Sequence, residues 1–256
     1  MTGRFDRLSL KNLPTEDKAV GTAVGAVLAG ALGLALVNPF GGDAATTTTA
    51  QAAAKNASAA VASSESNSSK ASTMSEAEAR KAGWTVPPRD VSPDEVIKLA
   101  EKQVGVSEGP DGQTKYHEWF VSTPQAKATA KRDGGFSVKA YNGAQWCNMF
   151  VSWLGAQTGV KNMGWDAYTV QHASWFKKTH RWGKEAKKGS VVFFDWDRGS
   201  SIGAIDHVGI VVKDNGDGTI TTIEGNTDDK VQKKVRDKGL VVGYGYPDYK
   251  ASGNEA

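Results

Sequence analysis

Residues 142–159, NGAQWCNMFVSWLGAQTG, contain the only cysteine of the 256-residue chain and form the segment around which the fold is interpreted. Apolar residues recur at helical spacing after residue 148, and Gly159 supplies a helix stop signal. The pair Asn142-Gly143 predicts a turn before this helix. Cys147 is therefore expected where a loop becomes a helix.

This position affects the expected reactivity of the Cys147 thiol. The first turn of a helix has unpaired N–H groups and a partial positive charge, which favour a thiolate over a thiol. A thiolate is the nucleophilic form of cysteine. The alternative from the residue alone is a small buried side chain, a common role of a free cysteine. The nucleophile hypothesis requires a base and an orienting group elsewhere in the chain.

Composition limits the classes of function. A formal net charge of +3 is too small for a nucleic-acid-binding signature, so no nucleic-acid partner is predicted. A single cysteine excludes an intramolecular disulfide and a cysteine-cluster metal site. One basic cluster near aromatic residues is interpreted either as a contact for an anionic polymer or as a solvated surface. Its members are Lys177, Lys178, Arg181, Lys184, Lys187 and Lys188.

The N-terminal region is predicted to lie outside the folded domain. Residues 19–37, AVGTAVGAVLAGALGLALV, carry no charge and are long enough to span a bilayer, but they are rich in Ala and Gly. Residues 1–42 are interpreted as a signal peptide or, alternatively, as an N-terminal membrane anchor. Either interpretation predicts a secreted or cell-surface protein whose N-terminal segment passes through or sits in the membrane.

An Ala/Ser/Thr-rich linker follows at residues 43–90. Its composition cannot bury enough apolar surface to offset chain entropy, so disorder is predicted, with a short helix at residues 75–82. The folded domain is predicted at residues 91–250, and residues 251–256 form a tail.

Helices are predicted in the first half of this domain. Ser92-Pro93-Asp94-Glu95 combines an N-cap serine, a proline at the first helical position and a capping-box glutamate. Further short helices are expected at residues 115–121 and 172–178. His117, in the first of these, is interpreted as a packed or surface histidine. Residues 131–135 are interpreted as a basic loop.

Strands are predicted in the second half. The β-forming runs are residues 190–194, 207–213 and 219–224, and the last two flank an Asn-Gly-Asp-Gly loop that predicts a hairpin. Residues 231–236 and 240–246 are predicted to form a second hairpin around residues 237–239. Helices followed by antiparallel strands indicate an α+β domain.

The first hairpin brings polar residues together. Opposed residues in an antiparallel pair share a face, and alternate residues repeat it. With a regular four-residue loop, His207 lies opposite Asn226, and Glu224 is its diagonal neighbour on the same face. A loop with any even number of residues keeps His207 and Glu224 on one face. A loop with an odd number places them on opposite faces, unless a β-bulge adds one residue to a strand. The alternative is an ordinary edge histidine with a solvated glutamate.

Four segments together resemble the CHAP family, the cysteine, histidine-dependent amidohydrolases/peptidases. They are Gln145-Trp146-Cys147 with residues 149–153 (MFVSW), residues 189–194 (GSVVFF), residues 206–211 (DHVGIV) and residues 223–226 (IEGN). The resemblance covers roughly residues 94–246 and keeps the family's order. It implies a papain-like α+β fold, with N-terminal helices, the nucleophile at a helix N-terminus and a C-terminal antiparallel sheet. The related NlpC/P60 family usually has Asp-Cys-Ser-Gly at the nucleophile, which this chain lacks.

The resemblance also implies roles for individual residues. It assigns Cys147 as nucleophile, His207 as base, and Glu224 with Asn226 as orienting polar groups. Trp146, Trp165 and Trp196 are candidates for binding substrate, or else core residues. Some CHAP domains hold calcium through acidic residues ahead of the cysteine. No such cluster is found here and Asp195-Trp196-Asp197 stands alone, so no metal or cofactor is predicted.

The predicted function is an exported hydrolase of amide bonds in bacterial peptidoglycan, acting through a cysteine thioester. The sequence leaves open an N-acetylmuramoyl-L-alanine amidase or a peptidoglycan endopeptidase. An anionic wall polymer is a possible second partner at the basic cluster. Two alternatives from other classes are a catalytically inactive cell-wall-binding module and a membrane-anchored scaffold protein.

Overall fold

The structure is a computed structural model that describes residues 74–250. The predicted signal or anchor segment, residues 43–73 of the predicted linker and the tail at 251–256 lie outside the described residues. Between residues 74 and 250, no helix is both long enough and apolar enough to cross a membrane.

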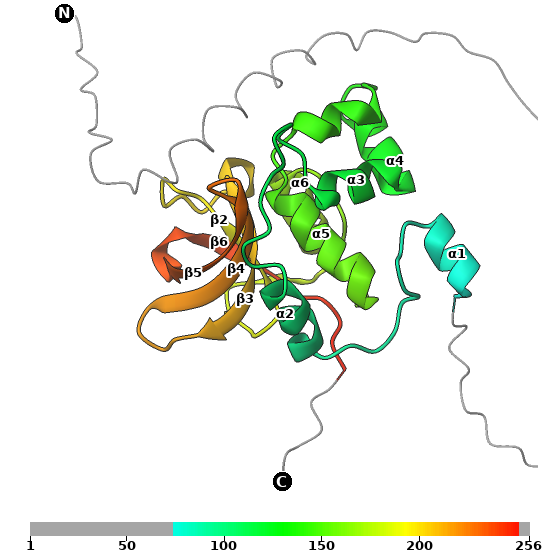
Figure 1. Cartoon of the computed structure of the whole chain (residues 1–256). Coiled ribbons are helices and arrows are strands. Elements are labelled where there is room, and N and C mark those ends of the chain that lie inside the picture. The colour runs from blue at the N-terminus through cyan, green and yellow to red at the C-terminus, as the bar shows by residue number, and fades with distance from the viewer. Residues whose placement is uncertain (1–73, 251–256) are drawn as a thin grey trace, which may run out of the picture. The chain divides into compact units, whose positions relative to one another are not determined.

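Helices precede strands, and the predicted α+β class is confirmed (Figure 1). The α-helices are α1 (Glu76–Lys81), α2 (Pro93–Glu101), α3 (Lys115–Ser122), α4 (Pro124–Arg132), α5 (Cys147–Thr158) and α6 (Thr169–Lys178), with short 3₁₀ helices η3 (Val138–Gly143), η4 (Ile202–Ala204) and η5 (Lys238–Leu240). The strands are β1 (Trp182–Gly183), β2 (Val191–Phe194), β3 (His207–Asp214), β4 (Thr219–Thr227), β5 (Lys230–Asp237) and β6 (Val241–Gly245). They form one antiparallel sheet in the order β1-β6-β2-β3-β4-β5, consistent with a papain-like CHAP domain.

The helix boundaries follow local chemistry. The predicted helix start at Ser92 is confirmed, because the Ser92 hydroxyl accepts from the Glu95 N–H and the Glu95 carboxylate accepts from the Ser92 N–H. Helix α5 ends at Gly159, whose φ of 76° is the left-handed conformation that glycine adopts at little cost.

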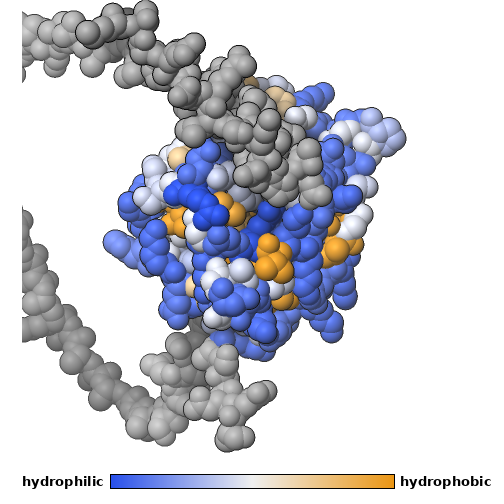
Figure 2. Space-filling view, turned by 90° about the vertical axis from the view of Figure 1, so that its left-hand side faces the viewer, coloured by the Kyte–Doolittle hydropathy of each residue, from blue (hydrophilic) through white to orange (hydrophobic). Residues whose placement is uncertain are grey.

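Helix α5 is the centre of the domain. It packs against β3 and β4 of the sheet and against α2 and α3 on its other sides (Figure 1). Every residue of α5 except Gln157 is buried, so its position is fixed by contacts around the whole helix. The face of the molecule in Figure 2 is mostly hydrophilic, with only small, separate hydrophobic areas.

The β3–β4 hairpin reaches the predicted register by an unexpected route. Asp214 pairs with Ile220, so the loop between paired residues is odd, which alone would turn His207 away from Glu224. A register shift between Val211 and Lys213 inserts one extra residue and restores the original alternation. The bulge therefore keeps His207 and Glu224 on one face.

The predicted second hairpin is wrong. Strand β5 pairs with β4 instead, through a tight turn at Asp228 and Asp229, whose φ values are 48° and 57°. Strand β6 pairs with β1 and β2 on the other side of the sheet. The Asp237-Lys238-Gly239 segment does not form a hairpin turn, because the Asp237 side chain accepts from the Gly239 N–H at the start of η5.

Two further predictions differ from the structure. Residues 131–135 were expected to be a loop, but Lys131 and Arg132 form the last turn of α4, which begins with Thr123 as N-cap and Pro124. The short helix predicted at residues 75–82 is present as α1, but residues 74–90, which were included in the disordered linker, contact the domain. The Trp119 indole N–H donates to the Gly83 carbonyl at 3.1 Å, and the Thr85 N–H donates to the Ala156 carbonyl.

Candidate active site

Cys147 is the first residue of α5, as predicted, and is 4% exposed. The preceding Trp146 is the N-cap but provides no side-chain cap. Its ring is fully buried, its indole N–H donates to Glu108 at 2.7 Å, and it stacks on Tyr116. Trp146 therefore fixes the start of the helix. As a core residue, it does not line a substrate surface.

His207 is the first residue of β3, and its ring is held by Glu224 of β4. The Nε2–H group donates to Glu224 Oε2 at 3.0 Å. The other nitrogen, Nδ1, is buried and lacks a hydrogen-bond partner of good geometry within residues 74–250. Because Glu224 occupies Nε2, Nδ1 is the nitrogen left for the Cys147 thiol, which also interacts with this ring.

The protonation of His207 follows from these neighbours. Burial by itself would lower the pKa, because it disfavours the charged ring. Interactions with the Cys147 side chain and the Glu224 carboxylate outweigh burial and raise the pKa of His207 to about 9. An imidazolium beside a cysteine is the arrangement that stabilises a thiolate.

Glu224 is fully buried and is held by several donors. Arg236 of β5 donates from Nη2 to Oε2 at 2.8 Å and from Nε to Oε1 at 3.1 Å. The Thr222 hydroxyl donates to Oε1. Burial favours the neutral acid, but His207 and Arg236 hold the pKa of Glu224 well below its usual range. Glu224 is thus an ionised carboxylate at neutral pH.

Trp196 covers the other side of the histidine. Its ring stacks on the His207 ring at a centroid distance of 5.5 Å and on Phe194 at the same distance. The Arg236 guanidinium lies 4.9 Å from the Trp196 centroid, within cation–π range. Arg236 therefore contacts both the carboxylate that orients His207 and the ring that packs on it.

Gly209 makes room for this arrangement. It lies on β3 two residues after His207, on the same face, and a Cβ placed there would lie 2.7 Å from Glu224 Cγ and 3.1 Å from the Ile223 carbonyl oxygen. The absence of a side chain lets Glu224 lie across the strand and reach the imidazole.

Asn226 lies beside the site but not on the histidine. It has a left-handed φ of 58°, and its side-chain amide donates to Gln145, two residues before Cys147. Of the two orienting groups expected for His207, Glu224 makes the contact and Asn226 does not. Asn226 instead joins the end of β4 to the segment that enters α5.

The remaining predicted residues are dispersed. Trp165 packs against Trp84 and Trp119 in another part of the domain, so of the three tryptophans Trp196 alone contacts the histidine. Asp195 accepts from the Asp197 N–H. Among residues 74–250, no group of three or more His, Cys, Asp or Glu residues has the arrangement to hold a metal ion.

Much of the basic cluster is neutralised by neighbours. Arg181 pairs with Asp248, Lys187 with Glu185, and Lys188 with Asp94. Lys184 donates to the Val242 carbonyl at 2.7 Å.

The roles of Arg236, Thr222 and Gly209 were not predicted from the sequence. Thr222 was detectable, because it shares the strand and the face of Glu224. The role of Arg236 was not detectable, because the predicted second hairpin paired its strand, β5, with β6 instead of β4. The turn-forming Asp228-Asp229 pair was the available signal for the correct one.

Comparison with known families shows that the model of the CHAP domain matches residues 139–226, which confirms the resemblance found in the sequence. The matched segment begins before Cys147 and ends at Asn226, and so includes His207 and Glu224. No curated protein matches the chain. The CHAP domain implies amidase or peptidase activity of the peptidoglycan-hydrolase type.

Proposed function

Because residues 139–226 belong to the CHAP domain family, we propose that this protein is an exported cysteine hydrolase that cleaves an amide bond of the peptidoglycan peptide. The observation that carries the proposal is the contact of Glu224 with His207 at 3.0 Å, together with the interaction of the Cys147 side chain with the same ring. A nucleophile, a base and a group that orients the base are the three parts that covalent amide hydrolysis requires.

In the first half of the reaction, the Cys147 sulfur attacks the amide carbonyl. His207 carries the proton that came from the Cys147 thiol and donates it to the nitrogen of the departing amine, so the amine leaves as a neutral molecule. The backbone N–H of Cys147 at the N-terminus of α5 supplies a donor for the developing oxyanion. The products of this half are a thioester on Cys147 and a free amine.

In the second half, water cleaves the thioester. His207 accepts a proton from the water, the hydroxide adds to the thioester carbonyl, and Cys147 leaves as a thiolate. Glu224 keeps Nε2 protonated throughout, so Nδ1 is the nitrogen that exchanges protons. Arg236 holds Glu224 in position for this task.

An inactive wall-binding module is less well supported. A buried carboxylate that contacts both an arginine and a histidine is costly to desolvate, and binding alone gives no reason to retain it. Export by residues 1–42, as a cleaved signal or as an anchor, is part of the proposal and rests on the uncharged segment 19–37.

The test is digestion of purified peptidoglycan by the full chain and by Cys147→Ala, with mass spectrometry of the released fragments. The wild type is expected to release fragments with new amine and carboxyl ends, and Cys147→Ala none. The fragment masses distinguish the sugar–peptide amide from a bond within the peptide. Full activity of Cys147→Ala would overturn the proposal.

A further inference from the structure

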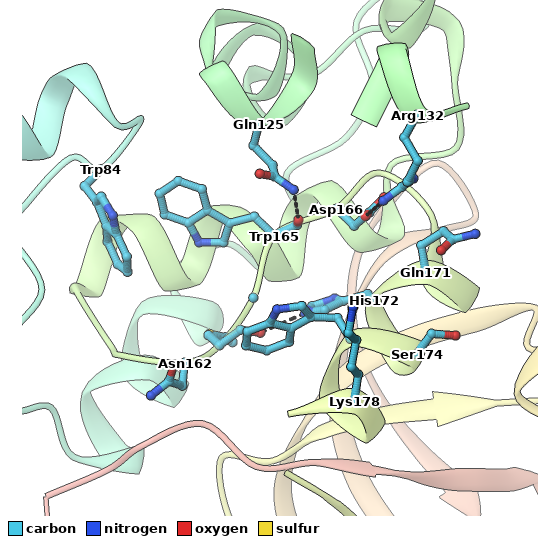
Figure 3. A pocket seen from close by; sticks show the side chains of 13 residues that line it. Trp84, Gln125, Arg132, Asn162, Trp165, Asp166, Gln171, His172, Ser174 and Lys178 are labelled. Atoms are coloured by element: carbon cyan, nitrogen blue, oxygen red, sulfur yellow. Dashed lines mark hydrogen bonds and ion pairs between the residues drawn. The ribbon is translucent and has the colours of Figure 1, made fainter. Parts of the chain in front are cut away.

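A pocket of about 470 Å³ is lined by residues other than those of the candidate active site. Figure 3 shows the residues that line it. It is an open pocket lined by α4, by the loop at residues 162–166 and by α6, with Trp84 contributed by the segment before α2. We call it the α6 pocket. Its volume is within the range of small-molecule binding sites, and its lining contains none of Cys147, His207 and Glu224.

Helix α6 presents one mainly polar face to this pocket. Gln171, Ser174, Trp175 and Lys178 follow the i, i+3, i+4, i+7 spacing of a single helix face, and all four line the cavity. The side chains of Gln171, Ser174 and Lys178 make no hydrogen bond or ion pair with any residue between 74 and 250. Donors and one positive charge therefore face the cavity without a protein partner.

Aromatic rings form the rest of the lining. Trp84, Trp165 and Trp175 are each half-buried and line the pocket. The centroids of Trp84 and Trp165 are 4.5 Å apart and the ring planes are tilted by 57°, so the two rings pack against each other at one side of the pocket (Figure 3). Exposed indole surface beside unpartnered polar groups suits a ligand with an apolar ring face and polar substituents.

The pocket is built on a fixed loop. Gln125 of α4 donates to the Trp165 carbonyl at 2.9 Å, and Arg132 makes two hydrogen bonds to Asp166 (Figure 3). Gly164 has a φ of 75° and lies so close to His172 and Trp175 that a Cβ there would be within 2.8 Å of both. A preformed site loses less conformational entropy on binding than a flexible one.

The same loop is joined to the candidate active site. Asn148, the residue after Cys147, donates to the Asp166 carbonyl at 2.8 Å. Ser152, one turn further along α5, also bonds to Asp166. Helix α5 therefore carries the nucleophile and also two side chains that hold the loop of the pocket.

We propose that the α6 pocket binds an N-acetylated sugar unit of the glycan strand, with a carboxylate of the attached peptide at Lys178. This inference rests on the proposed function, since it names the part of the peptidoglycan substrate that is held away from the bond being cut. A pyranose ring has a face of C–H groups that packs on indole rings, and its amide and hydroxyl groups match Gln171 and Ser174. The ammonium of Lys178 forms a charge-assisted hydrogen bond to the carboxylate.

The test measures binding of muramyl dipeptide, which carries one sugar and one carboxylate, to the full chain bearing Cys147→Ala. Tryptophan fluorescence and calorimetry report the affinity. We expect saturable binding that Lys178→Gln weakens by roughly tenfold, the scale of one charge-assisted hydrogen bond. Trp84→Ala should weaken binding as well. Lys177→Gln is the matched control, because Lys177 is the adjacent exposed lysine of α6 and does not line the pocket.

With Cys147 intact, Lys178→Gln should raise KM for peptidoglycan and leave kcat within about twofold, since the residue acts on binding alone. Absence of saturable binding, or equal effects of Lys178→Gln and Lys177→Gln, would overturn the pocket assignment. If the wild type cleaves peptidoglycan but muramyl dipeptide does not bind, the pocket inference fails and the proposed function stands. If Cys147→Ala cleaves peptidoglycan, the proposed function fails.

Discussion

Cys147 and Asn148 are neighbours in sequence, and each lies against a different buried histidine. His207, beside Cys147, is 2% exposed, and His172, beside Asn148, is 1% exposed. Their pKa values nevertheless move in opposite directions. That of His207 is raised to about 9, whereas burial lowers that of His172, an effect the Met163 carbonyl only partly offsets.

The difference comes from the partners. His172 contacts an amide oxygen of Asn148 at 2.9 Å and the Met163 carbonyl at 2.7 Å, neither of which carries a formal charge. His207 contacts a buried carboxylate. Equal burial thus gives one histidine that supports the structure and one that is suited to proton transfer. The comparison can be tested by changing each histidine and each partner.

The largest expected effect is on turnover, from His207→Gln. Without a base, the Cys147 thiol must ionise unaided, and turnover should fall by a factor on the order of 10⁴ to 10⁶. The matched change, His172→Gln, leaves buried acceptors without a donor and should cost on the order of 1–3 kcal/mol of stability while the folded fraction still turns over. Cleavage kinetics and thermal unfolding of both variants check this. Equal kinetic effects would contradict the division of roles.

Glu224→Gln should come next. The amide oxygen still accepts from Nε2, but the negative charge that stabilises the imidazolium is lost. By analogy with other triads, the rate loss is on the order of 10⁴, with measurable activity retained. The alkaline limb of the rate–pH profile should move to lower pH, because loss of the carboxylate lowers the pKa of His207. A profile identical to that of the wild type would show that Glu224 does not act on His207.

Arg236→Met should have a smaller effect. Arg236 touches Glu224 and Trp196 rather than the reacting atoms, and such supporting residues typically contribute about 10–100-fold. Arg236→Lys keeps the charge but loses the two-point contact, so it should restore only part of the rate. A shift of the rate–pH profile in Arg236→Met separates this positioning role from loss of packing. An unchanged profile would contradict it.

The smallest effect is on stability and depends on pH. The pKa of His207 is raised from 6.5 to about 9 on folding, so its contribution to stability is complete below pH 6.5 and is lost as pH rises through 9. Denaturant unfolding between pH 6 and 10 should therefore show a decline for the wild type that is weaker in Glu224→Gln. The same slope in both proteins would contradict the assignment.

The sequence predicted the start of α5, because helix signals are local. It also predicted that His207 and Glu224 share a face, but for a regular even loop, whereas the structure has an odd loop and a compensating bulge between Val211 and Lys213. The sequence did not identify the strand that pairs with β5. Several turn-forming segments are compatible with the pattern of strands, and tertiary packing decides which pairing forms. Because β5 was assigned the wrong partner, the contact of Arg236 with Glu224 was not predicted. Trp146 illustrates another limit: whether an aromatic ring faces substrate or core depends on Tyr116 and Glu108, which are distant in sequence.

The most direct test of this account is an NMR titration of the imidazole protons in the full chain, with His207→Gln and His172→Gln used to assign the two signals. The account predicts that the pKa of His207 is near 9 and that of His172 is below the ordinary value of 6.5. Two similar pKa values near 6.5, or the reverse order, would show that Glu224 and Cys147 do not hold His207 as the charged member of a catalytic pair.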